Sequence, residues 1–272
     1  HERGLTLIEL MVAMAISLLI VLAAVSALIV TRQGFTSVDA SSQLRDNARF
    51  SADLVQRLGV QAGYQDDVFA SKKASAAEIA ANIAPSVYGF NNALLSDANP
   101  LTESTARTSA DGSDILILRY QTAETFPGSG TADGSIIDCS GQAPSSVATG
   151  KGDSIYSILH VAMIGNEPSL MCTYLDSTTN TVTTVPIVQG VENFQVLYGT
   201  DNNVDSVPDK YVSAEGLSTT DDWRRVRSLR IGMVLRGAPH SHTSEDGQKF
   251  YPLGQIDVDT FFEPPDGEID RL

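Results

Sequence analysis

The first thirty residues of the chain carry the longest apolar run. Leu10 to Thr31 is a stretch of 22 residues without a charged side chain. As a helix it would rise about 33 Å, which is enough to cross the hydrocarbon core of a bilayer. A cleavable secretory signal fits less well, because its apolar core is only about 7–15 residues long. The pattern therefore predicts a membrane-spanning helix near the N-terminus.

The next thirty residues are polar with helical spacing of the apolar positions. One face of the expected helix carries Leu44, Ala48, Ala52, Val55 and Leu58. No proline lies between Leu5 and Gly63, and Gly59 and Gly63 are both suitable stop signals. We therefore expect one long helix over residues 5–62, with an apolar first half and an amphipathic second half. A membrane anchor followed by a separate short helix is the alternative.

The rest of the chain divides into a connecting region and a region of strands. Residues 63–112 are rich in Ala, Ser, Asn and Thr, with a short helix expected within 70–86 and loop elsewhere. Strand patterns dominate residues 113–272, and the alternation of "RSLRIGMVLRG" (227–237) is typical of a half-buried antiparallel strand. The other expected strands are 114–120, 154–164, 169–175, 181–188 and 193–199, with a hairpin turn at "GNEP" (165–168). The predicted fold class is α+β, with an antiparallel sheet following the long helix.

Charge and motifs narrow the function classes. The net charge is −15, from 18 basic and 33 acidic residues, which disfavours DNA, RNA and anionic lipid as partners. The sequence has no HExxH, GxSxG, GxGxxG or phosphate-loop motif, so we do not expect an enzyme. His160 lies within an expected strand and is interpreted as a packed residue. The loop "HSHTSED" (240–246) is interpreted as solvated in preference to a metal site.

Two cysteines, Cys139 and Cys172, lie in the region of strands. In a reducing cytosol, two such cysteines are most often unrelated thiols. In a chain that threads a membrane near its N-terminus, a single disulfide in an oxidising compartment is the favoured interpretation. Such a bridge would stabilise the fold by roughly 3–4 kcal/mol on the chain-entropy view.

Glu9 is a carboxylate just inside the edge of the apolar segment. An ionised carboxylate at the centre of a spanning helix costs about 2.5–3.5 kcal/mol on insertion scales, and less near the interface. A cut between Gly4 and Leu5 would create an α-amine four residues before Glu9. That ammonium is best placed to meet Glu9 of a neighbouring copy, where the pair would neutralise itself in an apolar bundle.

The segment "GLTLIELMVA" (4–13) resembles the class III signal of type IV prepilins, with Glu as the fifth residue after the cut. The usual first mature residue is Phe, and this chain has Leu5 instead. The resemblance implies that a prepilin peptidase cuts after Gly4 and methylates the amine of Leu5, so that residues 1–4 are the remnant of a leader. It also implies a pilin-like fold, in which the first half of the helix joins the filament core and the second half packs on the sheet.

Three further segments resemble the PilW group of minor pilins: "CTYL" (172–175), 188–212 and "WRRVRSLRIGMVLRG" (223–237). This resemblance implies a minor pilin that joins other minor pilins and the major pilin, primes pilus assembly and sits at the tip with a tip adhesin. The chain would cross the inner membrane once, with its C-terminal domain in the periplasm, before entering an extracellular pilus. A pseudopilin of a type II secretion system is the alternative. A signal-anchored periplasmic binding protein or enzyme is a third class.

Five arginines gather near the expected strand 227–237: Arg224, Arg225, Arg227, Arg230 and Arg236. Solvated or ion-paired strand arginines are the favoured interpretation. Docking to an acidic neighbouring subunit is the second interpretation, and DNA binding is the third.

The loop "DNNVDSVPD" (201–209) has the oxygen-rich spacing that calcium prefers. Positions 1, 3, 5 and 9 are Asp201, Asn203, Asp205 and Asp209, and the carbonyl of Val207 is at position 7. Ser206 stands where such loops carry Gly, and Val212 stands where they carry a bidentate Glu. A calcium site and a bare acidic turn therefore both stay open, and the bare turn is favoured.

Overall fold

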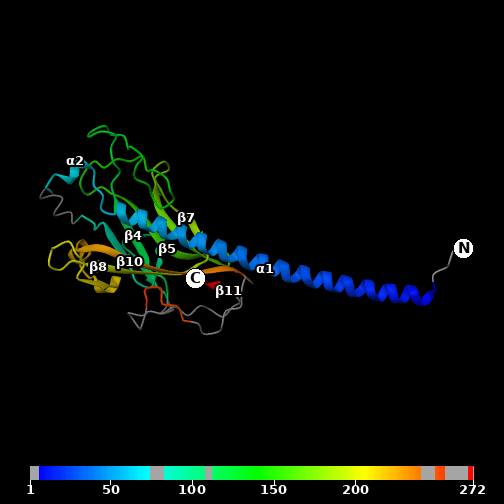
Figure 1. Ribbon diagram of the computed structural model, residues 1–272. Coiled ribbons are helices and arrows are strands. Elements are labelled where there is room, and N and C mark those ends of the chain that lie inside the picture. Colours follow the sequence, from blue (N-terminus) through cyan, green and yellow to red (C-terminus); the bar gives the residue numbers. More distant parts are fainter. Residues whose placement is uncertain (1–5, 74–82, 108–111, 240–248, 255–268, 272) are drawn as a thin grey trace.

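A single helix of 55 residues, α1 (Leu7–Gln61), extends far beyond the rest of the molecule (Figure 1). The computed structural model describes residues 6–73, 83–107, 112–239, 249–254 and 269–271. The apolar first half of α1 is exposed, whereas the buried residues of its second half fall on one face: Ala40, Leu44, Ser51, Val55 and Leu58. The helix is continuous through both halves, so the alternative of an anchor with a separate helix is wrong.

Gly63, and not Gly59, marks the end of α1. Gly59 lies within the helix, and Ala62 is the C-cap. Gly63 adopts a φ of 80°, which a residue with a Cβ rarely takes. Its N–H donates to the carbonyl of Arg119 at 2.8 Å, so the chain turns directly onto the sheet at this point.

The first sheet has five antiparallel strands in the order β1-β4-β5-β6-β7. They are β1 (Val87–Phe90), β4 (Ile115–Tyr120), β5 (Ile155–Ile164), β6 (Glu167–Asp176) and β7 (Thr181–Gln189). The predicted hairpin joins β5 to β6, with Ile164 opposite Glu167 and Gly165 at a φ of 62°. Its turn is shorter than "GNEP", because β6 already begins at Glu167.

The second sheet has the strand order β11-β10-β8-β9 and is also antiparallel. It contains β8 (Val191–Thr200), β9 (Lys210–Val212), β10 (Val226–Pro239) and β11 (Ile269–Arg271). The short 3-10 helix η1 (Ala214–Gly216) and the helix α4 (Thr220–Arg224) connect β9 to β10. The predicted α+β class, with a long helix and antiparallel sheets, is confirmed.

Within the connecting region 63–112, where a short helix and otherwise loop were expected, the structure also has three short strands. This region contains the short helix α2 (Asp67–Ala70), the edge strand β1, and a small two-stranded sheet of β2 (Ala93–Leu95) and β3 (Ser104–Ala106). These strands are three or four residues long, too short to show an alternating pattern. The stretch 70–86, where a short helix was expected, lies mostly outside the described residues.

Both sheets and the second half of α1 share one core. Its fully buried members include Leu58 from the helix, Leu116 and Leu118 from β4, and Phe194 from β8. A smaller cluster of Ala93, Ile115, Ile117 and Ile158 lies on the other face of the first sheet. Both faces of β4 are therefore covered, which explains why "DILILRY" is a continuous apolar run and does not alternate.

Asp114, just before β4 of the first sheet, forms hydrogen bonds to β8 of the second sheet. Its carboxylate accepts the N–H of Val196 on β8 and the N–H of Asn92, both at 2.8 Å, and its own N–H donates to the carbonyl of Phe194. Burial raises the pKa of Asp114 from 3.8 to about 6, although both backbone donors act in the opposite direction. Between pH 3.8 and about 6, the folded state therefore keeps a proton on Asp114 that the unfolded state has released.

We expect Asp114→Ala to destabilise the protein by an amount that grows as the pH falls. The raised pKa means that the stability from Asp114 is complete below pH 3.8 and is lost as the pH rises through 6. Between pH 6 and pH 4 the deficit of the variant should increase by about 2 kcal/mol. Urea unfolding across this range measures it. The exposed Asp53→Ala serves as control, and an equal pH profile for Asp114→Ala and wild type would contradict the assignment.

Candidate functional site

The N-terminus of α1 is capped by Thr6 and Glu9. The N–H and the Oγ1 of Thr6 both donate to Oε2 of Glu9 at 2.9 Å, and the N–H of Glu9 donates to Oγ1 of Thr6 at 3.4 Å. This capping box holds the Glu9 carboxylate over the first turn of the helix, where the helix dipole also favours a negative charge. The sequence analysis predicts a partner for Glu9 in a neighbouring copy and does not include this local partner, Thr6. Gly4 and Leu5 lie outside the described residues.

The first half of α1 is long and apolar enough to cross a membrane. Its large side chains are exposed on every side, among them Leu7 at 78% and Leu18 at 71%. Its polar side chains bond to the helix itself, since Ser17, Ser26 and Thr31 donate to the carbonyls four residues earlier. This half of the helix is therefore built to be covered by lipid or by other apolar helices.

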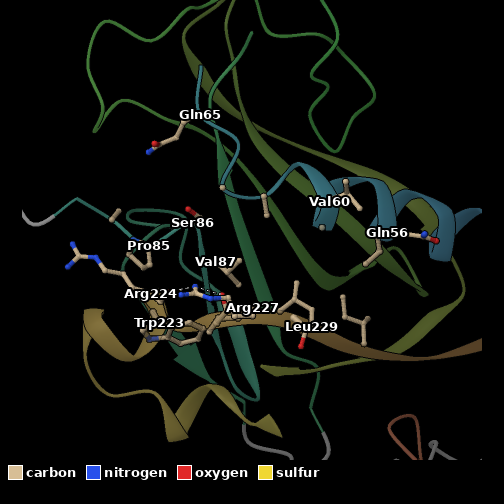
Figure 2. A pocket seen from close by; sticks show the side chains of 18 of the residues that line it. Gln56, Val60, Gln65, Pro85, Ser86, Val87, Trp223, Arg224, Arg227 and Leu229 are labelled. Carbon is tan, nitrogen blue, oxygen red and sulfur yellow. Dashed lines mark hydrogen bonds between the residues drawn. The ribbon is translucent and has the colours of Figure 1, made fainter. Parts of the chain in front are cut away.

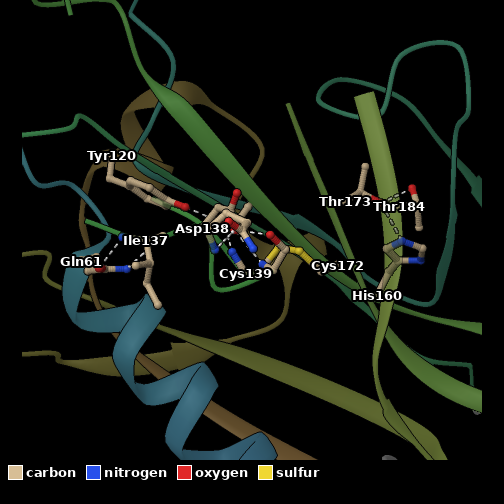
Figure 3. Close-up of a disulfide and its surroundings, with 12 residues drawn as sticks. Gln61, Tyr120, Ile137, Asp138, Cys139, His160, Cys172, Thr173 and Thr184 are labelled. Carbon is tan, nitrogen blue, oxygen red and sulfur yellow. Dashed lines mark hydrogen bonds between the residues drawn. A yellow bond between two sulfur atoms is a disulfide. The ribbon is translucent and has the colours of Figure 1, made fainter. Parts of the chain in front are cut away.

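Cys139 and Cys172 form the predicted disulfide (Figure 3). It joins a long loop to β6, and both cysteines are buried in the main core. The N–H of Cys139 donates to Oγ of Ser157 at 2.9 Å, and Ser157 also bonds to the hydroxyl of Tyr120 at 2.6 Å. The bridge therefore lies in the core beside these buried hydrogen bonds and is protected from solvent.

His160 is a packed residue, as the sequence indicates (Figure 3). Its Nε2 lies 3.0 Å from Oγ1 of Thr173, which in turn lies 2.7 Å from Oγ1 of Thr184. Burial, with a smaller contribution from the charge of Arg107, lowers the pKa of His160 to about 4. The ring is neutral at physiological pH. The other histidine motif, residues 240–246, lies outside the described residues.

The five arginines do not form one free patch. Arg224 pairs with Asp221 at 3.0 Å, Arg227 lies 3.5 Å from Asp201, and Arg236 pairs with Glu167 at 2.7 Å. Arg230 lies over the ring of Tyr211, 4.6 Å from its centre. Ion-paired and stacked strand arginines, the favoured interpretation, account for these four.

The acidic loop 201–209 brings only part of the expected calcium ligands together. Oδ2 of Asp205 and Oδ1 of Asp209 both accept from Nδ2 of Asn203, at 3.1 and 3.3 Å, so two carboxylates converge on one amide. The carboxylate of Asp201 instead accepts the N–H groups of Val204 and Ser206, at 2.6 and 2.9 Å.

Ser206 adopts a φ of 69°, the conformation for which such loops use Gly. Within the described residues, no group of three or more His, Cys, Asp or Glu side chains is placed to hold a metal. Asn203, Asp205 and Asp209 each accept a backbone N–H as well, at 3.1, 2.8 and 2.7 Å, so these side chains are engaged within the loop as Asp201 is. Calcium binding thus stays a prediction.

If calcium binds, the protein should melt at a higher temperature with millimolar calcium than with a chelator. Extracellular sites with dissociation constants of about 0.1–1 mM would give roughly 0.6–1.8 kcal/mol at 2 mM calcium. Asp205→Ala should abolish the difference, whereas Asp221→Ala, outside the loop, should keep it. The same melting curve with calcium and with chelator would leave only the acidic turn.

A groove of about 1030 Å³ lies between the last turns of α1, the segment 83–87 and the first half of β10 (Figure 2). Val60 stands on its helical wall with 80% of its surface exposed, and Leu229 lies on the opposite wall. Sequence reasoning missed the groove, because its walls come from three segments far apart in the chain.

Comparisons with known proteins agree with this arrangement. The prokaryotic N-terminal methylation motif matches residues 1–25, which include Glu9 and the beginning of α1. The family described as Type IV Pilus-assembly protein W matches residues 155–269, from β5 to the beginning of β11. No curated protein and no solved structure gives a significant match. With a methylation motif on an exposed apolar helix and a PilW segment in the sheets behind it, the chain is a PilW-like type IV pilin.

Proposed function

We propose that this chain is a minor pilin of a type IV pilus, which joins other minor pilins in a complex that primes assembly and sits at the tip. The observation that carries the proposal is the presence of both family matches on one chain. The methylation motif belongs to subunits that assemble through their N-terminal helix. The PilW match covers most of the sheet domain.

In this proposal, a prepilin peptidase cuts after Gly4 and methylates Leu5 while α1 anchors the chain in the inner membrane. The C-terminal domain then faces the periplasm, an oxidising compartment suited to the buried disulfide Cys139–Cys172. On assembly, α1 exchanges lipid for the helices of the major pilin and of other minor pilins, and a tip adhesin binds beyond them. A pseudopilin of a type II secretion system would share α1, and the PilW match favours the pilus.

The test is mass spectrometry of sheared pili from the cells that make this protein. Wild-type chain should be present and should begin with N-methylated Leu5, and deletion of the gene should reduce piliation. Gly4→Val should leave an uncut precursor in the membrane. An intact leader on the chain in pili, or its absence from pili together with normal piliation of the deletion strain, would contradict the proposal.

Glu9 should matter for assembly more than for insertion. We expect Glu9→Leu protein to accumulate in the membrane but to enter pili about tenfold less, because the charge pair with a neighbouring amine is lost. Glu9→Gln is the matched control, since Gln can keep the capping box with Thr6 but carries no charge. If Glu9→Gln enters pili normally while Glu9→Leu does not, the cap and not the charge pair is the function of Glu9.

A further inference from the structure

Neither cysteine of the disulfide is accessible in the folded protein. Cys139 is 1% exposed and Cys172 is 0% exposed. Cys172 lies on β6, with Leu159 of β5 and Val185 of β7 opposite it on the two sides. Thiol–disulfide exchange proceeds by direct attack on a sulfur atom, so its rate depends on access to the bridge. In the folded protein, an attacking thiol can reach the bridge only after part of the structure opens.

The last turn of α1 holds the segment that carries Cys139 in place (Figure 3). Oε1 of Gln61 accepts the N–H of Ile137 at 3.2 Å, and Nε2 of Gln61 donates to the carbonyl of Ile137 at 3.1 Å. One amide side chain thus binds both main-chain groups of a residue that lies two positions before Cys139. Leu58 on the same turn is fully buried in the core that contains both cysteines. We call residues 58–61 the α1 lid.

The turn around Cys139 keeps its shape through its own hydrogen bonds. Oδ1 of Asp138 accepts the N–H groups of Ser140 and Gln142, at 2.8 and 3.1 Å. The N–H of Asp138 donates to the carbonyl of Gln142 at 2.8 Å. Because these bonds involve neither α1 nor β6, the turn can lift as a unit once the lid separates. This movement breaks the bond from the N–H of Cys139 to Ser157, while β5 and β6 stay paired.

We propose that the bridge is made before the α1 lid closes, by exchange between the open chain and an oxidant that itself carries a disulfide. The thiolate of one cysteine attacks the disulfide of the oxidant, which forms a mixed disulfide and releases one thiol. The thiolate of the other cysteine then attacks the sulfur of the first, which completes Cys139–Cys172 and releases the second thiol. Two electrons pass to the oxidant, and the two cysteine protons end on its two thiols.

The order of oxidation and closure has a direct consequence. A chain that closes its lid while still reduced buries two thiols, and an oxidant reaches them only when the lid opens again. A chain that is oxidised first carries a bridge that the closed lid protects from reductants. The exchange reaction must therefore act on the chain before it folds. This order follows from the fold of the domain and does not depend on the proposed function.

Oxidation of the reduced, full-length chain in detergent tests the order. The chain is refolded under dithiothreitol, desalted and mixed with oxidised glutathione, and the remaining thiols are alkylated and counted by mass spectrometry. The chain has 2 cysteines, so the signal comes from this pair alone. We expect the folded chain to be oxidised about a hundredfold more slowly than the same chain in urea. Equal rates would show that the bridge forms as easily after folding and would overturn the proposal.

Three variants test the α1 lid. Gln61→Ala removes both hydrogen bonds to Ile137 and should speed oxidation of the folded chain about tenfold, equivalent to about 1.4 kcal/mol of opening free energy. Gln56→Ala, at an exposed position of the same helix, is the matched control and should leave the rate unchanged. Ile117→Val lowers global stability from the smaller cluster on the other face of the first sheet, and it should also leave the rate unchanged.

Reduction of the native protein by dithiothreitol is a second measurement, and it does not require the reduced chain to refold. We expect it to be about a hundredfold slower than reduction in urea, and Gln61→Ala to accelerate it about tenfold. Equal rates for Gln61→Ala and Gln56→Ala in both reactions would overturn the role of the lid. Acceleration by Ile117→Val as large as that by Gln61→Ala would overturn it as well, because the bridge would then be reached by global unfolding.

Discussion

A fragment that begins at Gly63 is expected to be unfolded, whereas a fragment that begins at Thr36 is expected to fold as a soluble domain. The difference between them is the second half of α1, which places Leu44, Val55 and Leu58 in the main core. Burial of three such side chains contributes about 5–9 kcal/mol, close to the whole stability of a typical domain. Circular dichroism and thermal melting of the two fragments measure the difference.

The longer fragment also supplies an internal control. It omits the exposed apolar half of α1 but keeps every helical residue that is buried. Within it, Leu58→Ala should cost about 2–5 kcal/mol, because Leu58 is fully buried. A cooperative transition in the Gly63 fragment at the same temperature as in the Thr36 fragment would show that the sheets fold without the helix.

Loss of the disulfide should be the second largest effect. Cys139 and Cys172 are 33 residues apart, and closing a loop of this size in the unfolded chain is worth about 4 kcal/mol. The double variant Cys139→Ala, Cys172→Ala should therefore melt about 8–16 °C lower than the wild type. Alanine is chosen because both positions are buried in the apolar core.

A reductant provides the control for this variant. It should lower the melting temperature of the wild type toward that of the double variant, and it should leave the double variant unchanged. Equal melting temperatures for the two proteins under oxidising conditions would show that the bridge contributes nothing to stability.

The parts of the fold with strong periodicity could be predicted from the sequence. The helical face that begins with Leu44 and the strand "RSLRIGMVLRG" are each long enough to show their period. The strand lies where expected, and so does the helical face, except that Ser51 is buried and Ala52 is exposed. The disulfide could be predicted because the chain has only two cysteines and a membrane segment that indicates an oxidising compartment. The length of β4 was also clear, since a strand covered on both faces is a continuous apolar run.

Short elements and assembled surfaces could not be predicted in this way. β1 has four residues and β9 has three, fewer than an alternating pattern needs, and their positions depend on pairing with β4 and β8. The charge of Glu9 predicts a partner in another molecule, although the sequence also has the Thr-x-x-Glu spacing of a capping box. The groove depends on how far α1 lies from β10, a distance that no local pattern contains.

The position of the disulfide along the chain has a mechanical consequence. Tension applied between α1 and the second sheet would act along the chain that joins them, and residues 139–172 lie on that path. The covalent bridge bypasses these 33 residues, so they cannot lengthen under tension even if β5 and β6 separate. At about 3.4 Å per residue, this removes about 110 Å of extension from a subunit that unfolds under load.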